Sequence, residues 1–279
     1  MDVVNVNLSR NKNIKQEILK LEQVSFQYEE SQKALIQIDV TFYAGEKVAV
    51  LGNNGAGKST LFLVCNGVQQ PTNGRIYLNE QEMGSGKKDQ LALRQSIGLV
   101  FQDVDVQIIG STVYEEISFG PMNLHLSKDE VRERVEGVIQ NFDLGGFEER
   151  APHRLSGGEK KRVCIADVLA MKPKIIFFDE PTTGLDPKNT LLFEENLKML
   201  EKQGMGTVIA THDVDFAWRF AERIILFHEG QIVGDGDPDE LFRDKELMKL
   251  CGLVQPMLLH IGEKLGWTKI PRRVEELDI

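Results

Sequence analysis

Short apolar runs predict strands at several separate points along the chain. Residues 17–28 alternate with a period of roughly two, and Thr41–Tyr43 leads into the apolar run Lys47–Leu51. Similar runs predict further strands at residues 75–78, 97–101, 174–178, 207–211 and 224–227. The first of these follows Asn73-Gly74, which predicts that it belongs to a hairpin.

Helical spacing of apolar residues predicts helices at 59–65, 127–142, 159–171 and 189–203. Strands and helices alternate on both sides of a helix-rich segment, which predicts an α/β domain with a central sheet, an antiparallel β subdomain and a helical insert. We expect a polar N-terminal tail at 1–16, one domain at 17–245 with the insert at about 103–172, and a C-terminal extension at 246–279. The pattern of the extension indicates nothing beyond packing on the core.

Composition narrows the classes of function. The 279 residues carry a formal net charge of -10, which opposes binding to polyanions, so no nucleic-acid partner is expected. Apolar runs such as Ile175–Phe178 are far shorter than the roughly 20 residues of a transmembrane helix. Residues 1–15 lack the apolar core of a secretory signal, which predicts a cytoplasmic location, and three widely spaced cysteines predict buried free thiols.

A glycine-rich loop connects the predicted strand 47–51 to the predicted helix 59–65. It reads Gly52-Asn53-Asn54-Gly55-Ala56-Gly57-Lys58-Ser59 and matches the P-loop pattern GxxxxGK[ST]. Glycines let backbone N–H groups close around phosphate oxygens, and the helix N-terminus adds a positive dipole. We therefore expect Lys58 to reach the β and γ phosphates of a nucleotide.

Carboxylates and a histidine follow two later strands. Asp179 ends the run 175–178, and with the Ser59 hydroxyl it is placed to hold Mg²⁺. Glu180 comes next and is the candidate general base for the water that attacks the γ phosphate. His212 follows the strand 207–211, where it would orient that water, although a lone histidine is more often structural.

The sequence Leu155-Ser156-Gly157-Gly158-Glu159 precedes the predicted helix 159–171. Ser156 and Glu159 have the spacing of a capping box, in which each side chain bonds the other's backbone N–H. Two interpretations stay open for the motif by itself. It either does no more than cap a helix, or it also presents glycine amides to an anion at a positive helix end.

Taken together, these motifs resemble the ABC ATPase family. They are the P-loop, Gln102 after a strand, the LSGGE motif at Leu155, IIFFDE at Ile175, Leu185-Asp186, and His212, in the family's order. The resemblance covers about residues 17–245. It implies an ATPase whose two copies meet head to tail, so that Ser156, Gly157 and Gly158 of one copy cap ATP on the P-loop of the other. It also implies that Tyr28 stacks on adenine and that Gln102 is a further metal ligand.

The candidate site residues are therefore these. Catalysis is assigned to Glu180, His212, Lys58 and Gln102, and Mg²⁺ binding to Ser59, Gln102 and Asp179. ATP binding is assigned to Tyr28, Gly52, Asn53, Asn54, Gly55, Ala56, Gly57, Lys58, Ser59, Thr60, Ser156, Gly157, Gly158, Glu159 and Asp186.

A narrower resemblance is to the energy-coupling factor (ECF) importers, notably the cobalt-type ATPases. It rests on the segments 100–107, 112–116 and 119–124 and on Glu159-Lys160-Lys161-Arg162-Val163. The chain departs from the group's pattern at Val104, Val106, Glu159 and Asp167. The resemblance implies a homodimer or a pair with a similar ATPase, separate integral-membrane subunits docking near residues 102–126, and a peripheral position on the cytoplasmic face of the membrane. Cobalt or nickel is the cargo it implies, with vitamins next.

Two other classes remain for comparison. A GTPase would carry an Asn-Lys-x-Asp guanine-binding motif, which this sequence lacks. A soluble ABC protein that acts on DNA or ribosomes shares every nucleotide-site residue named above. The single P-loop, the lack of a long heptad pattern and the acidic balance favour the transport ATPase.

Overall fold

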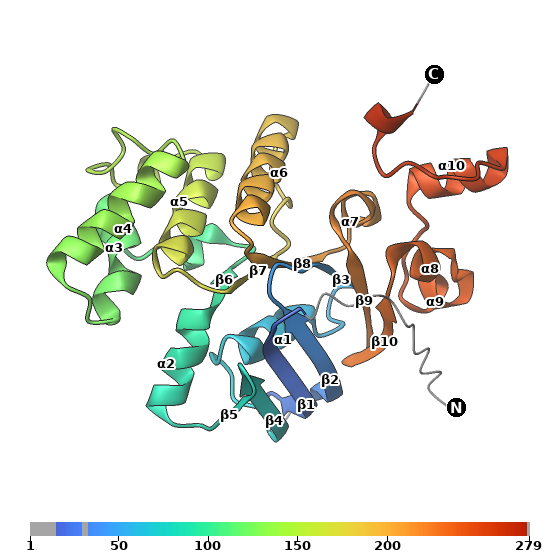
Figure 1. Ribbon diagram of the computed structural model, residues 1–279, viewed down its shortest axis with the longest axis horizontal. Coiled ribbons are helices and arrows are strands. Elements are labelled where there is room, and N and C mark those ends of the chain that lie inside the picture. The colour runs from blue at the N-terminus through green and yellow to red at the C-terminus, as the bar shows by residue number, and fades with distance from the viewer. Residues whose placement is uncertain (1–14, 30–32, 278–279) are drawn as a thin grey trace.

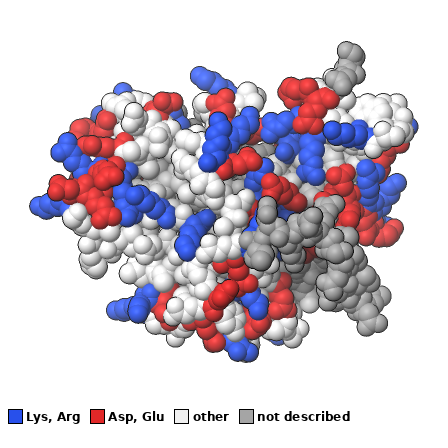
Figure 2. All heavy atoms as spheres, in the orientation of Figure 1, with Lys and Arg blue, Asp and Glu red and all other residues white. Residues whose placement is uncertain are grey.

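The computed structural model describes residues 15–29 and 33–277. The predicted polar tail, except for its last two residues, lies outside this range. The described residues form two sheets with a cluster of helices on one flank and a group of C-terminal helices on the other (Figure 1). Basic and acidic side chains are interspersed over the face shown in Figure 2.

The main sheet has six strands and is parallel except at one edge. Its order is β10 (Gln231–Gly236), β9 (Arg223–His228), β3 (Lys47–Leu51), β8 (Gly206–Thr211), β7 (Ile175–Asp179) and β6 (Ile97–Val100), with only β10 antiparallel to its neighbour. Strands β3, β7 and β8 are almost entirely buried, as parallel strands covered on both faces must be. The carboxyl ends of these three strands therefore lie beside one another.

The second sheet is antiparallel, with the order β2 (Lys33–Tyr43), β1 (Glu17–Gln27), β4 (Asn73–Leu78) and β5 (Gln81–Met83). The expected α/β fold with a central sheet and an antiparallel subdomain is confirmed. The hairpin turn is not at Asn73-Gly74, since both residues belong to β4. It is at Asn79 and Glu80, whose φ values of 48° and 66° provide the left-handed pair of a tight turn.

One hydrophobic core fills the space between the two sheets around α1 (Lys58–Cys65). Phe62 of α1 stacks on Phe177 of β7 with ring centroids 4.7 Å apart, and Phe42 of β2 meets the same ring edge-on at 5.3 Å. These large aromatic contacts hold the P-loop helix against the sheet.

The helical cluster lies between β6 and β7 in the sequence. It contains α3 (Val113–Asn123), α4 (Lys128–Asn141) and α5 (Gly157–Ala170), with the short helices η1 (Val104–Val106) and η2 (Pro152–Arg154). Its apolar core is continuous with one side of the main sheet. Thr112 and Ser127 cap α3 and α4, and each side chain accepts the backbone N–H of the residue three positions later. Helix α2 (Lys87–Ser96) leads into β6.

Helices α6 (Pro187–Lys202) and α7 (Val214–Phe220) follow β7 and β8, and the C-terminal helices are α8 (Pro238–Arg243), α9 (Lys245–Leu250), α10 (Met257–Leu265) and η3 (Val274–Glu276). The last segment packs on α7: the buried indole N–H of Trp218 donates to the carbonyl of Pro271 at 3.0 Å. The Arg272 guanidinium lies over the Trp218 ring and donates to the carbonyl of Ala221 at 2.7 Å. The C-terminal residues thus cap the end of α7.

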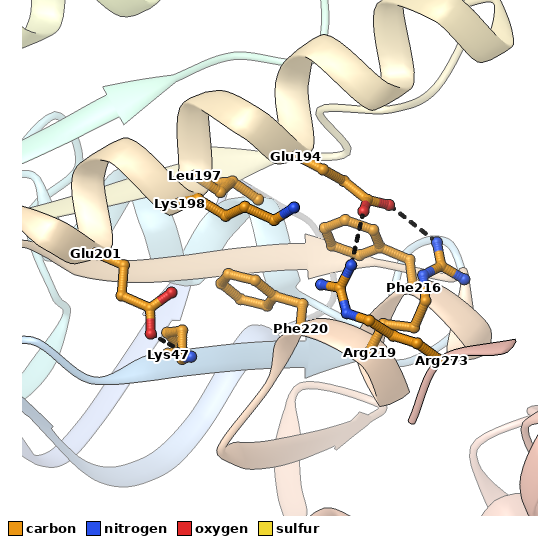
Figure 3. A pocket seen from close by; sticks show the side chains of 9 residues that line it. All are labelled: Lys47, Glu194, Leu197, Lys198, Glu201, Phe216, Arg219, Phe220 and Arg273. Atoms are coloured by element: carbon orange, nitrogen blue, oxygen red, sulfur yellow. Dashed lines mark hydrogen bonds and ion pairs between the residues drawn. The ribbon is translucent and has the colours of Figure 1, made fainter. Parts of the chain in front are cut away.

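A small hollow of about 50 Å³ marks where α6, α7 and the C-terminal segment meet (Figure 3). Glu194 of α6 points toward both Arg219 of α7, at 3.1 Å, and Arg273, at 3.8 Å (Figure 3). On the opposite side Lys47 pairs with Glu201 at 2.8 Å. The hollow is small and lies at a junction of ion pairs.

No helix in the described part of the chain is long and apolar enough to cross a bilayer. All three cysteines are buried and free, as expected.

Candidate active site

The P-loop occupies the turn between β3 and α1, at the carboxyl end of the central strand of the sheet. Gly57 has a φ of 112°, and a Cβ atom there would lie 2.5 Å from the carbonyl oxygen of Ala34. No other residue type fits that position without displacing the β2 backbone. The first N–H groups of an α-helix have no partner within it, so those of α1 can bind a phosphate held by the loop.

Lys58 is buried, and its ammonium group lies within the loop. It donates to the carbonyl oxygens of Gly52, at 2.6 Å, and Asn53, at 3.2 Å. Burial lowers the pKa of Lys58, while the nearby charges of Glu180 and Asp179 oppose that effect. The cation is therefore held next to the two carboxylates of β7.

Asp179 and Glu180 are both buried at the end of β7. The Ser59 hydroxyl donates to the Asp179 carboxyl group, and burial raises the pKa of that carboxyl while this hydrogen bond opposes the rise. Asp179 Oδ1 and Glu180 Oε1 have no hydrogen-bond partner among the described residues. The unpaired oxygen of Asp179 beside the Ser59 hydroxyl is the kind of oxygen donor that Mg²⁺ takes.

His212 extends from the end of β8 to the other oxygen of Glu180. Its Nδ1 lies 2.9 Å from Glu180 Oε2, and the Thr183 hydroxyl donates to the same oxygen at 3.4 Å. Glu180 itself has a φ of 42°, a left-handed conformation that is strained for a residue with a side chain. One carboxylate oxygen is thus fixed by neighbours while the other stays available to accept a proton.

A cavity of about 310 Å³ brings much of the candidate site together. Its lining residues are Tyr28, Ala34, Asn54, Gly55, Ala56, Gly57, Lys58, Ser59, Thr60, Gln102, Asp179 and Glu180. Tyr28 is partly exposed at the edge, and its hydroxyl lies 3.3 Å from Thr60 Oγ1. Ala34 was not among the candidate residues, because no local motif marks it. It becomes part of the site through the pairing of β2 with β1.

Eight candidate residues do not line this cavity: Gly52, Asn53, His212 and the five described next. Ser156, Gly157, Gly158 and Glu159 form the start of α5, and Asp186 caps α6 by accepting the backbone N–H of Asn189 at 2.8 Å. The expected capping box is confirmed: Glu159 Oε2 accepts the Ser156 N–H at 2.7 Å, and Ser156 Oγ accepts the Glu159 N–H at 3.4 Å. Within one chain the LSGGE motif, which we call the signature motif, is separate from the P-loop. Helix α5, which begins at this motif, is called the signature helix.

Comparison with known proteins shows the family to which the chain belongs. The family model described as "ABC transporter" matches residues 35–183, and the chain belongs to that family. It is an ATP-binding ATPase, since the matched segment contains the P-loop, the signature motif and the β7 carboxylates.

The type within the family follows from closer relatives. The chain is 44% identical over 248 residues to the energy-coupling factor transporter ATP-binding protein EcfA of Methanothermobacter thermautotrophicus, covering 89% of this chain and 80% of the relative. It is 42% identical to EcfA of Methanococcus maripaludis, and the match covers 90% of this chain and 94% of the relative. We therefore assign it as an ATP-binding subunit of an ECF-type ABC transporter.

Solved structures agree with this assignment. CbiO1 of Clostridium perfringens, described as part of the ABC transporter complex CbiONQ, is 38% identical with a TM-score of 0.74, covering 89% of this chain and all of that one. The ATP-binding cassette MJ0796, solved as a dimer bound to ADP and Pi, is 30% identical with a TM-score of 0.70. The match covers 79% of this chain and 99% of that one.

Proposed function

We propose that this chain hydrolyses ATP as one half of a head-to-tail dimer and so drives uptake through separate membrane subunits. The observation that carries the proposal is the cavity in which the P-loop, Gln102, Asp179 and Glu180 converge. Gly157 and Gly158 at the start of α5 do not line this cavity, and a second copy would supply their N–H groups to the γ phosphate. The similarity to MJ0796, described as dimeric with ADP and Pi bound, supports a dimer.

Each site residue has a distinct part in this proposal. Lys58 and the P-loop amides bind the phosphates, and Tyr28 stacks on the adenine ring. Asp179, Ser59 and Gln102 hold Mg²⁺, which would neutralise charge on the β and γ phosphates. Glu180 accepts a proton from the attacking water through its unpaired oxygen, while His212 fixes the other oxygen and orients the carboxylate.

The proposed docking surface for the membrane subunits lies on η1, α3 and the loop between them. Four large apolar side chains are exposed there: Val106 (69%), Ile109 (67%), Phe119 (52%) and Met122 (62%). Exposed apolar side chains grouped in this way are typical of a protein interface. The neighbouring Glu115 is exposed, whereas Glu116 is buried and accepts backbone N–H groups, so charge reversal at 116 would disrupt the fold.

For the cargo we propose a transition-metal ion, cobalt or nickel. The cobalt-type features of the sequence support this choice, and so does the similarity to CbiO1 of the CbiONQ complex. A vitamin is the alternative cargo within the same class of importer. The proposed location is peripheral, on the cytoplasmic face of the membrane.

Co-purification tests the docking proposal. Tagged protein is isolated from its own gently solubilised membranes, and its partners are identified by mass spectrometry. Wild-type protein should bring a membrane scaffold and a small substrate-binding membrane protein, and Phe119→Asp should lose both because it places a charge in the apolar patch. Leu191→Asp, at an equally exposed apolar residue on α6, is the matched control and should retain them.

Reconstitution of the purified complex in vesicles identifies the cargo. ATP-dependent entry of labelled cobalt or nickel supports the metal proposal, whereas entry of a vitamin alone would replace it. Recovery of ribosomes or DNA with no membrane protein would contradict the transport function while leaving the ATPase assignment intact.

A further inference from the structure

Phe101, the residue immediately before Gln102, has both of its backbone polar groups held by side chains. Strand β6 ends at Val100, where its pairing with β7 stops, so Phe101 has left the sheet. Its N–H donates to Gln107 Oε1 at 3.0 Å, and its carbonyl oxygen accepts from Lys161 Nζ at 3.1 Å. The direction in which the chain enters Gln102 is therefore fixed by two residues from outside the strand.

Lys161 reaches this peptide from the signature helix. It lies in the second turn of α5, close behind Ser156–Glu159, and is 6% exposed. A buried ammonium group bonded to a carbonyl rather than a carboxylate is costly to keep. Any displacement of α5 moves the hydrogen bond that Lys161 makes to Phe101.

Gln107 reaches the same peptide from the proposed docking surface. It lies between Val106 and Ile109, the two most exposed apolar residues of that surface, and its side chain also bonds Asp167 of α5. Beyond it, the buried carboxylate of Glu116 accepts the N–H groups of Ile109, at 2.8 Å, and Gly110, at 2.5 Å, which fastens the end of the loop to α3. A partner that displaces Val106 or Ile109 would therefore also displace Gln107.

We propose that Gln107 and Lys161 are positioning residues that set Gln102 for metal binding, one from the docking surface and the other from the signature helix. The inference rests on the metal role of Gln102 in the proposed function. Partner docking and movement of α5 then converge on one peptide group. Neither residue touches nucleotide or metal, and each acts only through the Phe101 backbone.

Metal affinity tests this directly. In protein also carrying Glu180→Gln and loaded with ATP, binding of Mn²⁺ is measured by electron paramagnetic resonance. Gln107→Met keeps the length of the side chain but removes the acceptor, and should weaken Mn²⁺ binding about tenfold, as loss of a supporting partner commonly does. Metal-free ATP affinity should stay within about twofold, because the P-loop is untouched. Lys161→Met should act in the same direction.

Hydrogen exchange gives a second readout that does not depend on metal. The Phe101 amide should exchange faster in Gln107→Met, because its acceptor has been removed. Gln140→Met, an exposed glutamine on α4, is the matched control and should change neither measurement.

Gln102→Ala separates failure of the inference from failure of its premise. If Gln102→Ala weakens Mn²⁺ binding and Gln107→Met leaves it unchanged, the inference is overturned and the metal role of Gln102 stands. If Gln102→Ala itself has no effect on Mn²⁺ binding, the metal role fails and the inference falls with it.

Discussion

Replacing Asp167 with asparagine should stabilise the protein, and increasingly so as the pH rises from about 4 to about 8. Asp167 lies on α5, where burial and the charge of Glu116 raise the pKa of its carboxyl from 3.8 to about 8. In this window the folded chain keeps a proton that the unfolded chain has released, so wild-type stability falls with pH. Asparagine cannot ionise, and it retains groups that can hydrogen-bond Gln107.

The expected gain follows from the size of the pKa change. A rise from 3.8 to about 8 corresponds to about 6 kcal/mol of ionisation penalty above pH 8. Part of the Asp167 side chain reaches the surface, and solvent screening reduces this to about 3 kcal/mol. The same reasoning gives about 1 kcal/mol at about pH 5 and no gain below the ordinary pKa of aspartate.

Urea denaturation of both proteins across this pH range measures the gain. Glu133→Gln, at an exposed residue on α4 of the same helical cluster, serves as the control and should shift stability equally at every pH. A gain for Asp167→Asn that is the same at about pH 5 and about pH 8 would refute the reasoning, because it would show that the carboxyl ionises normally in the folded protein.

Two further variants test the nucleotide site. Glu180→Gln should bind ATP and close as a dimer but lose turnover about a hundredfold or more, since the amide still reaches His212 but accepts no proton. Phosphate release and ATP binding are measured on the same protein, and normal turnover would show that Glu180 is not the general base. Lys58→Ala should weaken ATP binding at least about a hundredfold in equilibrium titration, because the phosphates lose their buried cation. Lys88→Ala, an exposed residue on α2, should bind normally, and retained affinity in Lys58→Ala would contradict the P-loop role.

The sheet could be predicted well from the sequence, because its strands are short apolar runs followed by motif residues. The observed β3, β7, β8 and β9 each lie within about one residue of the predicted runs. The P-loop, Asp179, Glu180 and His212 could be proposed as site residues for the same reason, since each follows such a strand.

Helix α3 was not predicted, and its sequence explains why. Gly120 and Pro121 lie inside it and usually end a helix. The helix persists because it packs on α5: a Cβ atom at Gly120 would lie 2.7 Å from the Met171 side chain, so glycine permits the close approach. Gln107 and Lys161, our proposed positioning residues, match no nucleotide-binding motif, and the contact of Lys161 with Phe101 exists only once α5 has packed on the loop.

The position of β3 in the sheet has a consequence for the order in which the chain folds. Among the described strands, β3 pairs only with β8 and β9, so Lys47 meets Thr207 and Val48 meets Arg223. During synthesis the strand that precedes the P-loop therefore remains without partners until the ribosome has made most of the domain. Contacts this distant in sequence form slowly, and an apolar strand left waiting is exposed to aggregation. A nascent chain ending before β8 would contain the complete P-loop sequence without a sheet to shape it, which makes chaperone binding most valuable at that stage of translation.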